Sequence, residues 1–214
     1  KLPIFVARQW IRHRTANVNE YSARYSVLDR EFYLPSAENL AAQSSSNRQG
    51  RGEVLPPEQA ARVLELLRSD ASQVYAHYQE MMGGDDAPES EVEPLSPQRT
   101  GLARELARMN LTLNYYTQWY WKIDLHNLMH FVRLRADAHA QHEIRVYADI
   151  LANILSLWTP LAYAAFVEHR QNAVVLSATA WQALRRMLAG ETVSEESSGL
   201  GKREWRELQA ALAG

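Results

Sequence analysis

The sequence predicts an α+β fold in which a sheet is flanked by helices, within a single domain whose C-terminal half is rich in helix. Apolar residues recur at helical spacing over several long segments, whereas shorter segments alternate polar and apolar residues as a strand does. The chain has 214 residues, of which 46% are hydrophobic and 22% charged. This length and composition suit one globular domain with a sizeable core.

The N-terminal segment is expected to form a helix followed by a strand. Apolar residues at positions 4, 5, 7 and 11 predict a short helix over residues 4–14. Residues 17–25 then alternate between polar and apolar, which predicts a strand with Glu20, Ser22 and Arg24 on one side. The intervening apolar residues would bury that strand against the core.

The middle of the chain should contain one long helix between two loops. We expect a second short strand over 31–34, and a loop over the polar, glycine-containing stretch 43–52. Apolar spacing predicts an amphipathic helix over 57–82, closed by the glycine pair at 83–84. The acidic, proline-rich stretch 85–97 is interpreted as an exposed connection, with a regulatory or docking strip as the alternative.

The C-terminal half is expected to be mostly helical. A helix is predicted over 100–109, and the aromatic run in 111–121 favours a strand. Asp124 lies at an N-cap position for a helix over 125–133. Further helices are expected over 137–157, from Pro160 onward, and as two short amphipathic helices around the loop 191–201.

The composition excludes several classes of protein. The 25 acidic and 23 basic side chains give a formal net charge of −2, so we expect no nucleic-acid partner, although the aromatic run would by itself suggest base stacking. The chain has no cysteine, which excludes disulfides, thiolate zinc sites and cysteine nucleophiles. Polar residues and Pro160 interrupt the longest apolar stretch, 148–167, so we expect no membrane span.

The basic side chains suit the binding of anions. They comprise 20 arginines and three lysines, a bias that fits phosphate or carboxylate recognition and equally fits codon usage. The tripeptide at 12–14 is Arg-His-Arg, and Ser22 follows after seven residues, flanked by Glu20 and Arg24. Guanidinium groups can bind phosphate oxygens, Ser22 can donate a hydrogen bond, and Glu20 can accept one. The alternative is a solvated basic edge in which Glu20 pairs with Arg24.

The same segment resembles the flavin-dependent thymidylate synthases. The run from Arg12 to Ser22 matches their R-H-R-x7-S signature, and the surrounding PIFVARQWIRHR and NEYSARYS are also similar to that family. A second block from Trp121 to Arg145, WKIDLHNLMHFVRLRADAHAQHEIR, is similar to the family's downstream flavin- and uracil-binding segment. Two such blocks in the family's order make coincidence an unsatisfactory explanation.

The resemblance also implies how the chain is organised. It covers about residues 1–40 and 102–167, which implies a family domain over 1–170 and a helical C-terminal extension over 171–214. Family members carry an upstream segment with an H-x-T-P-F-E-H-like motif, and this chain begins after that point. We therefore expect the N-terminal part of the family domain to be missing.

The resemblance implies a role for each matching residue. Arg135 matches the catalytic arginine that activates the uracil ring by favouring ionisation at N3. Binding of dUMP is implied for Gln9, Arg12, Glu20, Ser22, Ala23, Arg24, Arg108 and Arg135. Binding of FAD is implied for Arg12, His13, Arg14, Glu20, Asp124, Leu125, His126 and His130.

The implied activity is the reductive methylation of dUMP to dTMP. Methylenetetrahydrofolate would be the carbon donor and co-substrate, FAD the flavin, and NADPH its reductant. The family also implies a cytoplasmic homotetramer whose sites combine several subunits. The alternative is a truncated flavin- or nucleotide-binding module without turnover.

The chemistry of the residues agrees with this activity. Transfer of carbon to C5 of uracil needs electron density there, and an arginine at the pyrimidine edge stabilises the anion that supplies it. No side-chain nucleophile is then required, which agrees with the absence of cysteine. Ser22 with His13 as its base is the alternative nucleophile, but the surrounding arginines favour a phosphate-facing serine.

The histidine spacings raise the possibility of a metal site. His126 and His130 lie at i, i+4, and His139 and His142 lie at i, i+3, which are spacings that metal sites use. The sequence H-N-L-M-H lacks the glutamate that follows the first histidine in zinc peptidases. We therefore expect no metal, and favour flavin contact over ordinary capping and packing for His126 and His130.

Overall fold

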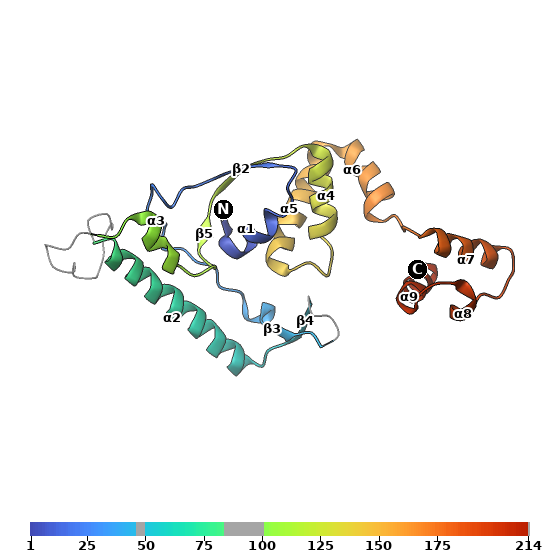
Figure 1. The fold of residues 1–214 in the computed structure, drawn as a ribbon, viewed down its shortest axis with the longest axis horizontal. Coiled ribbons are helices and arrows are strands. Elements are labelled where there is room, and N and C mark those ends of the chain that lie inside the picture. Colours follow the sequence, from blue (N-terminus) through green and yellow to red (C-terminus); the bar gives the residue numbers. More distant parts are fainter. Residues whose placement is uncertain (46–49, 84–100, 214) are drawn as a thin grey trace. The chain divides into compact units, whose positions relative to one another are not determined.

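The computed structural model describes residues 1–45, 50–83 and 101–213. The chain has the expected α+β composition (Figure 1). It divides into two compact units, Lys1–Leu157 and Trp158–Gly214, whereas the sequence suggested a boundary at residue 170. Each unit is described by itself below.

The strands of the first unit pair in short antiparallel ladders. Within the described ranges they form three separate two-stranded sheets. In the ladder that matters most for the site, the register places Glu20 opposite Trp119. The pairs are β1 (Leu2–Pro3) with β5 (Tyr116–Thr117), β2 (Asn17–Glu20) with β6 (Trp119–Lys122), and β3 (Ala41–Gln43) with β4 (Arg51–Val54).

Three strand predictions were too long. The strand expected over 111–121 is reduced to the short strands β5 and β6. The strand expected over 17–25 ends at Glu20, because the carbonyl oxygen of Ser22 accepts the N–H groups of Tyr25 and Ser26, at 3.2 and 3.1 Å. Ser22 and Arg24 therefore project from a turn and do not share a strand face with Glu20. The strand expected over 31–34 is reduced to one isolated bridge between Phe32 and Tyr115.

One ladder was not predicted. The strands β3 and β4 overlap the loop expected over 43–52 only at Gln43, Arg51 and Gly52, and they are mostly exposed. Their residues show no apolar alternation, which is the signal by which a strand is recognised in sequence. Backbone pairing of Ala41 with Val54 defines the hairpin instead.

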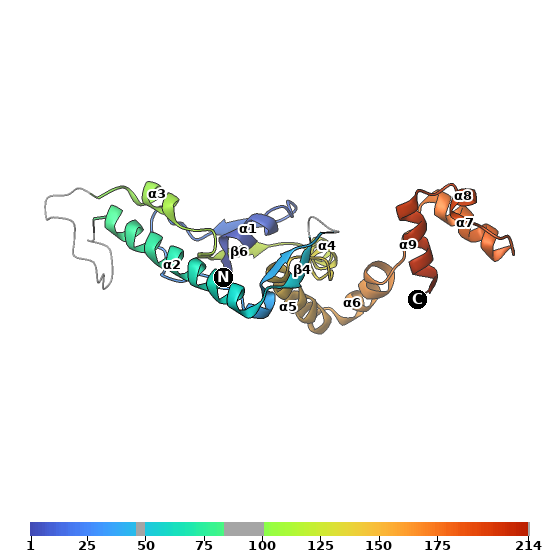
Figure 2. The same cartoon turned by 90° about the horizontal axis from the view of Figure 1, so that it is seen from below.

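The helices of the first unit follow the predicted order with altered ends. The long helix α2 is confirmed, and α3 lies beside its C-terminal end in both views, where the Leu102 N–H donates to the Met81 carbonyl oxygen at 2.7 Å (Figures 1 and 2). The acidic stretch 85–97 lies outside the described residues. The bounds are α1 (Ile4–Trp10), η1 (Ala37–Asn39), α2 (Pro57–Met81), α3 (Arg104–Ala107), η2 (Arg108–Asn110), α4 (Leu125–Arg135) and α5 (His142–Trp158).

Two predicted helices are shorter than expected. The N-terminal helix stops at Trp10, not near residue 14, and the helix expected from residue 137 begins at His142. The later start of α5 has a local cause: the side chain of Asp137 accepts the backbone N–H of His139 at 2.8 Å and holds a turn there.

Aromatic side chains form two parts of the core in this unit. On α2, Tyr75 stacks on Tyr115 at a centroid distance of 5.7 Å, and the Tyr115 hydroxyl donates to the Ala71 carbonyl oxygen at 2.7 Å. On the other side, Trp10 stacks on Phe131 at 4.6 Å and meets Trp121 edge-on at 5.0 Å. This second cluster fixes α1 against β6 and α4; the Arg-His-Arg tripeptide directly follows α1, and α4 carries Leu125, His126 and His130.

The second unit is helical. Ser177 caps α7 by accepting the Ala180 N–H at 3.1 Å, and Ala180, Ala183, Leu200 and Leu208 form a small core. The two amphipathic helices expected in the tail are α7 and α9, with a short extra helix in the connecting loop. The elements are α6 (Pro160–Phe166), the π-helical turn η3 (Val167–Gln171), α7 (Ala178–Leu188), α8 (Glu195–Ser198) and α9 (Lys202–Ala213).

In the described part of the chain, no helix is long and apolar enough to cross a membrane.

Candidate active site

The C-terminal end of α1 presents the Arg-His-Arg tripeptide. Beyond Trp10 the backbone continues as a turn, in which the N–H of Arg12 donates to Gln9 at 3.2 Å. The Arg12 and Arg14 side chains are exposed, and neither has a partner among the residues that the structure describes. Both guanidinium groups can therefore bind an incoming anion without first breaking an ion pair.

The start of α4 is set by the predicted cap. Asp124 Oδ1 accepts the N–H of Asn127 at 3.0 Å, which confirms the N-cap, and hydrogen bonds from Asn127 hold the pKa of Asp124 below its usual value. This start buries Phe131 and leaves His126 and His130 exposed. The two histidines thus face away from the core, where a ligand can reach them.

His13 and Arg135 form the clearest functional contact in the chain. The Nε of Arg135 donates to Nε2 of His13 at 3.0 Å. The His13 ring also lies 4.8 Å from Phe131 and 6.3 Å from His130, between ring centroids. We call these four residues the His13–Arg135 cluster.

The protonation state of His13 supports this contact. Burial, followed by the charges of Arg135 and His130, lowers the pKa of His13 to about 4. At neutral pH the imidazole is therefore uncharged and can accept the Arg135 hydrogen bond. Burial also lowers the pKa of Arg135, which nevertheless remains a cation at neutral pH.

A second group of predicted residues gathers around Glu105. Arg24 Nη2 lies 3.1 Å from Glu105 Oε2, and Arg108 Nε donates to the Glu105 carbonyl oxygen at 3.3 Å. The backbone N–H of Arg24 donates to Ser22 Oγ at 3.3 Å. We call Ser22, Arg24, Glu105 and Arg108 the Ser22–Arg108 cluster; the buried Ala23 lies within the same turn.

The sequence analysis missed Glu105. It is a single carboxylate in a mixed segment, so neither its spacing nor its type marks it as functional. Its ion pair with Arg24 is about half exposed on both sides, and such a pair is worth about 0.2–1 kcal/mol. A ligand phosphate can therefore displace it at little cost.

Glu20 does not pair with Arg24, as the solvated-edge alternative required. It accepts a hydrogen bond from the Thr117 hydroxyl at 2.6 Å, at the end of β2. The indole N–H of Trp119, opposite Glu20, is buried without a partner in the described part of the chain, as is that of Trp10. Buried donors are rarely left unpaired, so these two N–H groups are consistent with a bound ligand or water nearby.

The predicted residues thus fall into two groups within one chain. Gln9, Arg12, His13, Arg14 and the α4 residues lie at one end of the β2–β6 ladder. Over the described ranges, no hydrogen bond or ion pair joins the His13–Arg135 cluster to the Ser22–Arg108 cluster. The same ranges contain no group of three His, Asp or Glu side chains placed to hold a metal ion.

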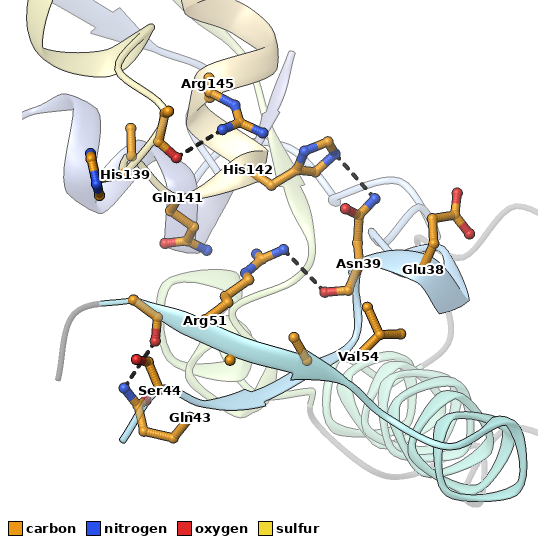
Figure 3. A pocket seen from close by; sticks show the side chains of 15 residues that line it. Glu38, Asn39, Gln43, Ser44, Arg51, Val54, His139, Gln141, His142 and Arg145 are labelled. Carbon is orange, nitrogen blue, oxygen red and sulfur yellow. Dashed lines mark hydrogen bonds between the residues drawn. The ribbon is translucent and has the colours of Figure 1, made fainter. Parts of the chain in front are cut away.

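A cavity of about 710 Å³ lies between the β3–β4 hairpin and the start of α5 (Figure 3). Its cationic side chains are already engaged: Arg51 Nη1 donates to the Asn39 carbonyl oxygen at 3.0 Å, and Arg145 Nη1 donates to that of Ala138 at 2.9 Å. The sequence did not predict this cavity, because its walls come from two segments, 38–54 and 138–145, that are far apart in the chain.

Glu143, behind this cavity, is a charged side chain in the core with 7% exposure. It accepts hydrogen bonds from Arg51, from Gln141 Nε2 at 2.8 Å, and from the Tyr33 hydroxyl at 3.2 Å. Burial by itself would raise the pKa of Glu143, but the bonds from Arg51 and Gln141 outweigh it and lower that pKa. Gln141 in turn accepts a hydrogen bond from Gln9.

The chain matches one known protein family over most of its length. The family model described as thymidylate synthase complementing protein matches residues 1–161. A flavin-dependent thymidylate synthase of Ruegeria pomeroyi is 62% identical over 212 residues, which are 99% of this chain and 66% of that protein. One of Gluconobacter oxydans is 62% identical over 214 residues, or 100% of this chain and 66% of that protein.

A solved structure has a similar fold. A UMP/dUMP methylase PolB from Streptomyces cacaoi, bound with 5-Br UMP, superposes with a TM-score of 0.66 at 28% identity, covering 78% of this chain and 70% of that one. The present chain spans 66% of the length of the two curated relatives described above.

Proposed function

Because the chain belongs to the thymidylate synthase complementing protein family, we propose that it is a flavin-dependent thymidylate synthase. The reaction transfers the methylene group of methylenetetrahydrofolate to C5 of dUMP and reduces it to the methyl group of dTMP. FAD, when bound, supplies the hydride for this reduction, and NADPH restores the reduced flavin. The observation that carries the proposal is the anchoring of Arg135 by neutral His13.

Arg135 is the catalytic residue of this proposal. The Nε of Arg135 donates a hydrogen bond to His13. Over the described residues the two Nη groups of Arg135 have no partner, so they are available to the edge of a pyrimidine. A fixed positive charge there stabilises the anion formed when N3 loses its proton, and this places electron density on C5. The side chain needs no reorganisation during the reaction, because His13 already holds it.

The geometry does not favour Ser22 as a nucleophile. Such a serine needs a base within hydrogen-bond reach, and over the described residues no bond joins Ser22 to His13. Ser22 instead accepts the N–H of Arg24 in a turn with two nearby arginines. A role in binding the dUMP phosphate, together with Arg24 and Arg108, fits this environment better.

The exposed cations at the end of α1 fit a flavin nucleotide. Arg12 and Arg14 offer guanidinium groups without partners in the described ranges, which suits the diphosphate of FAD. The exposed face of α4, with His126 and His130, lies next to His13 through the ring contact at 6.3 Å. Leu125 and the capping Asp124 begin the same helix.

The separation of the two clusters favours an oligomeric site. A single dUMP needs both the phosphate-binding Ser22–Arg108 cluster and the catalytic Arg135, which the isolated chain does not join. We therefore propose a homotetramer in which one subunit supplies the first cluster and another supplies the second. The proposal also includes a cytoplasmic location, where the folate and nucleotide substrates would be available.

Purified protein tests the proposed function. With FAD, NADPH, methylenetetrahydrofolate and dUMP present, we expect flavin absorbance that bleaches on reduction, followed by dTMP formation. Flavin and dUMP binding without any dTMP would instead support the alternative of a binding module without turnover.

A further inference from the structure

We propose that Glu143 and Gln141 are positioning residues that turn the carbonyl oxygen of Gln9 toward the nucleotide. This inference rests on the proposed function, because Gln9 belongs to the implied dUMP-binding residues. The inference adds Gln141 and Glu143 to the residues of the proposed site, and both lie outside the Arg-His-Arg signature. It also assigns the direction of one hydrogen bond, in which Gln9 accepts from the nucleotide. Gln9, Gln141 and Glu143 form a chain of hydrogen bonds that we call the Gln9 relay.

The Gln9 relay starts from the Glu143 carboxylate, which is a hydrogen-bond acceptor held in a fixed position. Glu143 is buried and its lowered pKa keeps it ionised at neutral pH, so both of its oxygens can only accept hydrogen bonds. Arg51 and Gln141 donate to Oε2, while the Tyr33 hydroxyl donates to Oε1. Three donors from different elements therefore hold the carboxylate in one orientation.

The charge of Glu143 then determines both amide orientations. Gln141 must turn its NH2 group toward the carboxylate, at 2.8 Å, so its own oxygen faces Gln9. Gln9 consequently uses its NH2 group to donate to Gln141, and its Oε1 points away as an acceptor. This assignment follows from the hydrogen-bond network, which is the proper basis for placing amide oxygens and nitrogens. Figure 3 shows Gln141 and Arg51 extending into the same space from opposite elements.

The oriented oxygen of Gln9 supplies a hydrogen-bond acceptor, which the neighbouring arginine side chain lacks. Gln9 lies one helical turn before His13 and beside Arg12, and an arginine offers only donors. A ligand N–H or O–H needs an acceptor, and Gln9 Oε1 provides one. The donor recognised would be the sugar 3′-hydroxyl of the nucleotide, because an acceptor at N3 would oppose the loss of the N3 proton beside Arg135.

The test measures dUMP binding to the FAD-loaded protein by titration calorimetry, together with kcat. The variants are Gln9→Met, Gln141→Met and the double variant, and Gln73→Met on the exposed face of α2 is the control. We expect each single relay variant to weaken dUMP binding about fivefold. The double variant should be no weaker than Gln9→Met, because Gln141 acts through Gln9. At saturating dUMP, kcat of Gln141→Met should be nearly unchanged, because Gln141 itself does not touch the nucleotide.

A conservative variant separates orientation from simple packing. Glu143→Gln keeps an oxygen that can accept from Gln141, so its dUMP affinity should stay close to that of the unmodified protein, whereas Glu143→Leu should match Gln141→Met. Unchanged dUMP affinity in Gln141→Met would overturn the relay. Additive losses in the double variant would overturn it as well.

Two nucleotide analogues test the assigned donor. The penalty of Gln9→Met should disappear with 2′,3′-dideoxy-UMP and persist with N3-methyl-dUMP. A penalty that persists with 2′,3′-dideoxy-UMP contradicts recognition of the 3′-hydroxyl, and one that persists with both analogues contradicts an acceptor role for Gln9. Unmodified protein that binds no dUMP would refute the proposed function, whereas binding that is insensitive to all relay variants refutes only the relay.

Discussion

At the scale of single residues, Arg135 has the most demanding role in the proposed reaction, because there a fixed charge beside the pyrimidine would stabilise a developing anion. Arg135→Ala should lower the rate of dTMP formation about 10²–10³-fold, the usual loss when a group that stabilises transition-state charge is removed. FAD content, measured by absorbance, should be largely retained. Arg133→Ala, on the same helix and exposed, is the matched control. Unchanged turnover in Arg135→Ala would refute the role assigned to it.

His13 should titrate far below an ordinary histidine. Its pKa of about 4 lies below the unperturbed value of 6.5, so the unfolded chain binds the proton first. The free energy of unfolding should therefore decrease as the pH falls from 6.5 toward 4, and be insensitive to His13 above that window. An NMR titration of the His13 ring in the flavin-free protein measures the pKa directly. A midpoint near 6.5 would show that the ring is not buried against Arg135.

At the scale of elements, the β3–β4 hairpin is tied to the core through Arg51. Arg51→Met would leave the Glu143 carboxylate buried without its cation, and we expect a loss of about 2–3 kcal/mol in the free energy of unfolding, measured with urea. Arg62→Met removes an exposed i, i+3 pair with Glu65 and should cost less than about 0.5 kcal/mol. Equal effects of the two changes would contradict the importance of the buried pair.

The same pair gives a pH dependence. The pKa of Glu143 is lowered by Arg51 and Gln141, so its contribution to stability is present above the ordinary glutamate value of 4.5 and is lost as the pH falls further. Arg51→Met should reduce this acid sensitivity.

Helices were easier to predict than strands in this chain. The helix α2 and the cap at Asp124 follow from apolar spacing and local hydrogen-bond chemistry, and the structure confirms both. The strand over 17–25 was overextended because alternation continues past Glu20 while the backbone turns at Ser22. The β3–β4 hairpin carries no alternation, so its pairing depends on backbone contacts that a sequence pattern does not contain.

Site residues were predictable only where a known signature marks them. Resemblance pointed to His13 and Arg135, but their hydrogen bond joins residues far apart in the sequence and emerges only from the packing of α1 on α4. Glu105 and Glu143 are isolated carboxylates with no informative spacing, and each gains importance from partners on other elements.

At the scale of the whole molecule, the proposed function needs two separate clusters for one small nucleotide. The Ser22–Arg108 cluster suits a phosphate, the His13–Arg135 cluster suits a pyrimidine beside a flavin, and the described chain does not connect them. The proposed site therefore draws on residues from distant segments of the chain. This separation also makes subunit assembly part of the proposed catalytic site.

The most direct measurement is complementation between two inactive variants. In the proposed homotetramer, Arg24→Ala would remove phosphate binding and Arg135→Ala would remove activation of the pyrimidine, so the tetramer of either variant alone should form little dTMP. Mixed tetramers, made by co-expression and separated by two affinity tags, should regain dTMP formation because some sites combine an intact Arg24 from one subunit with an intact Arg135 from another. Mixed tetramers as inactive as both parents would contradict the account.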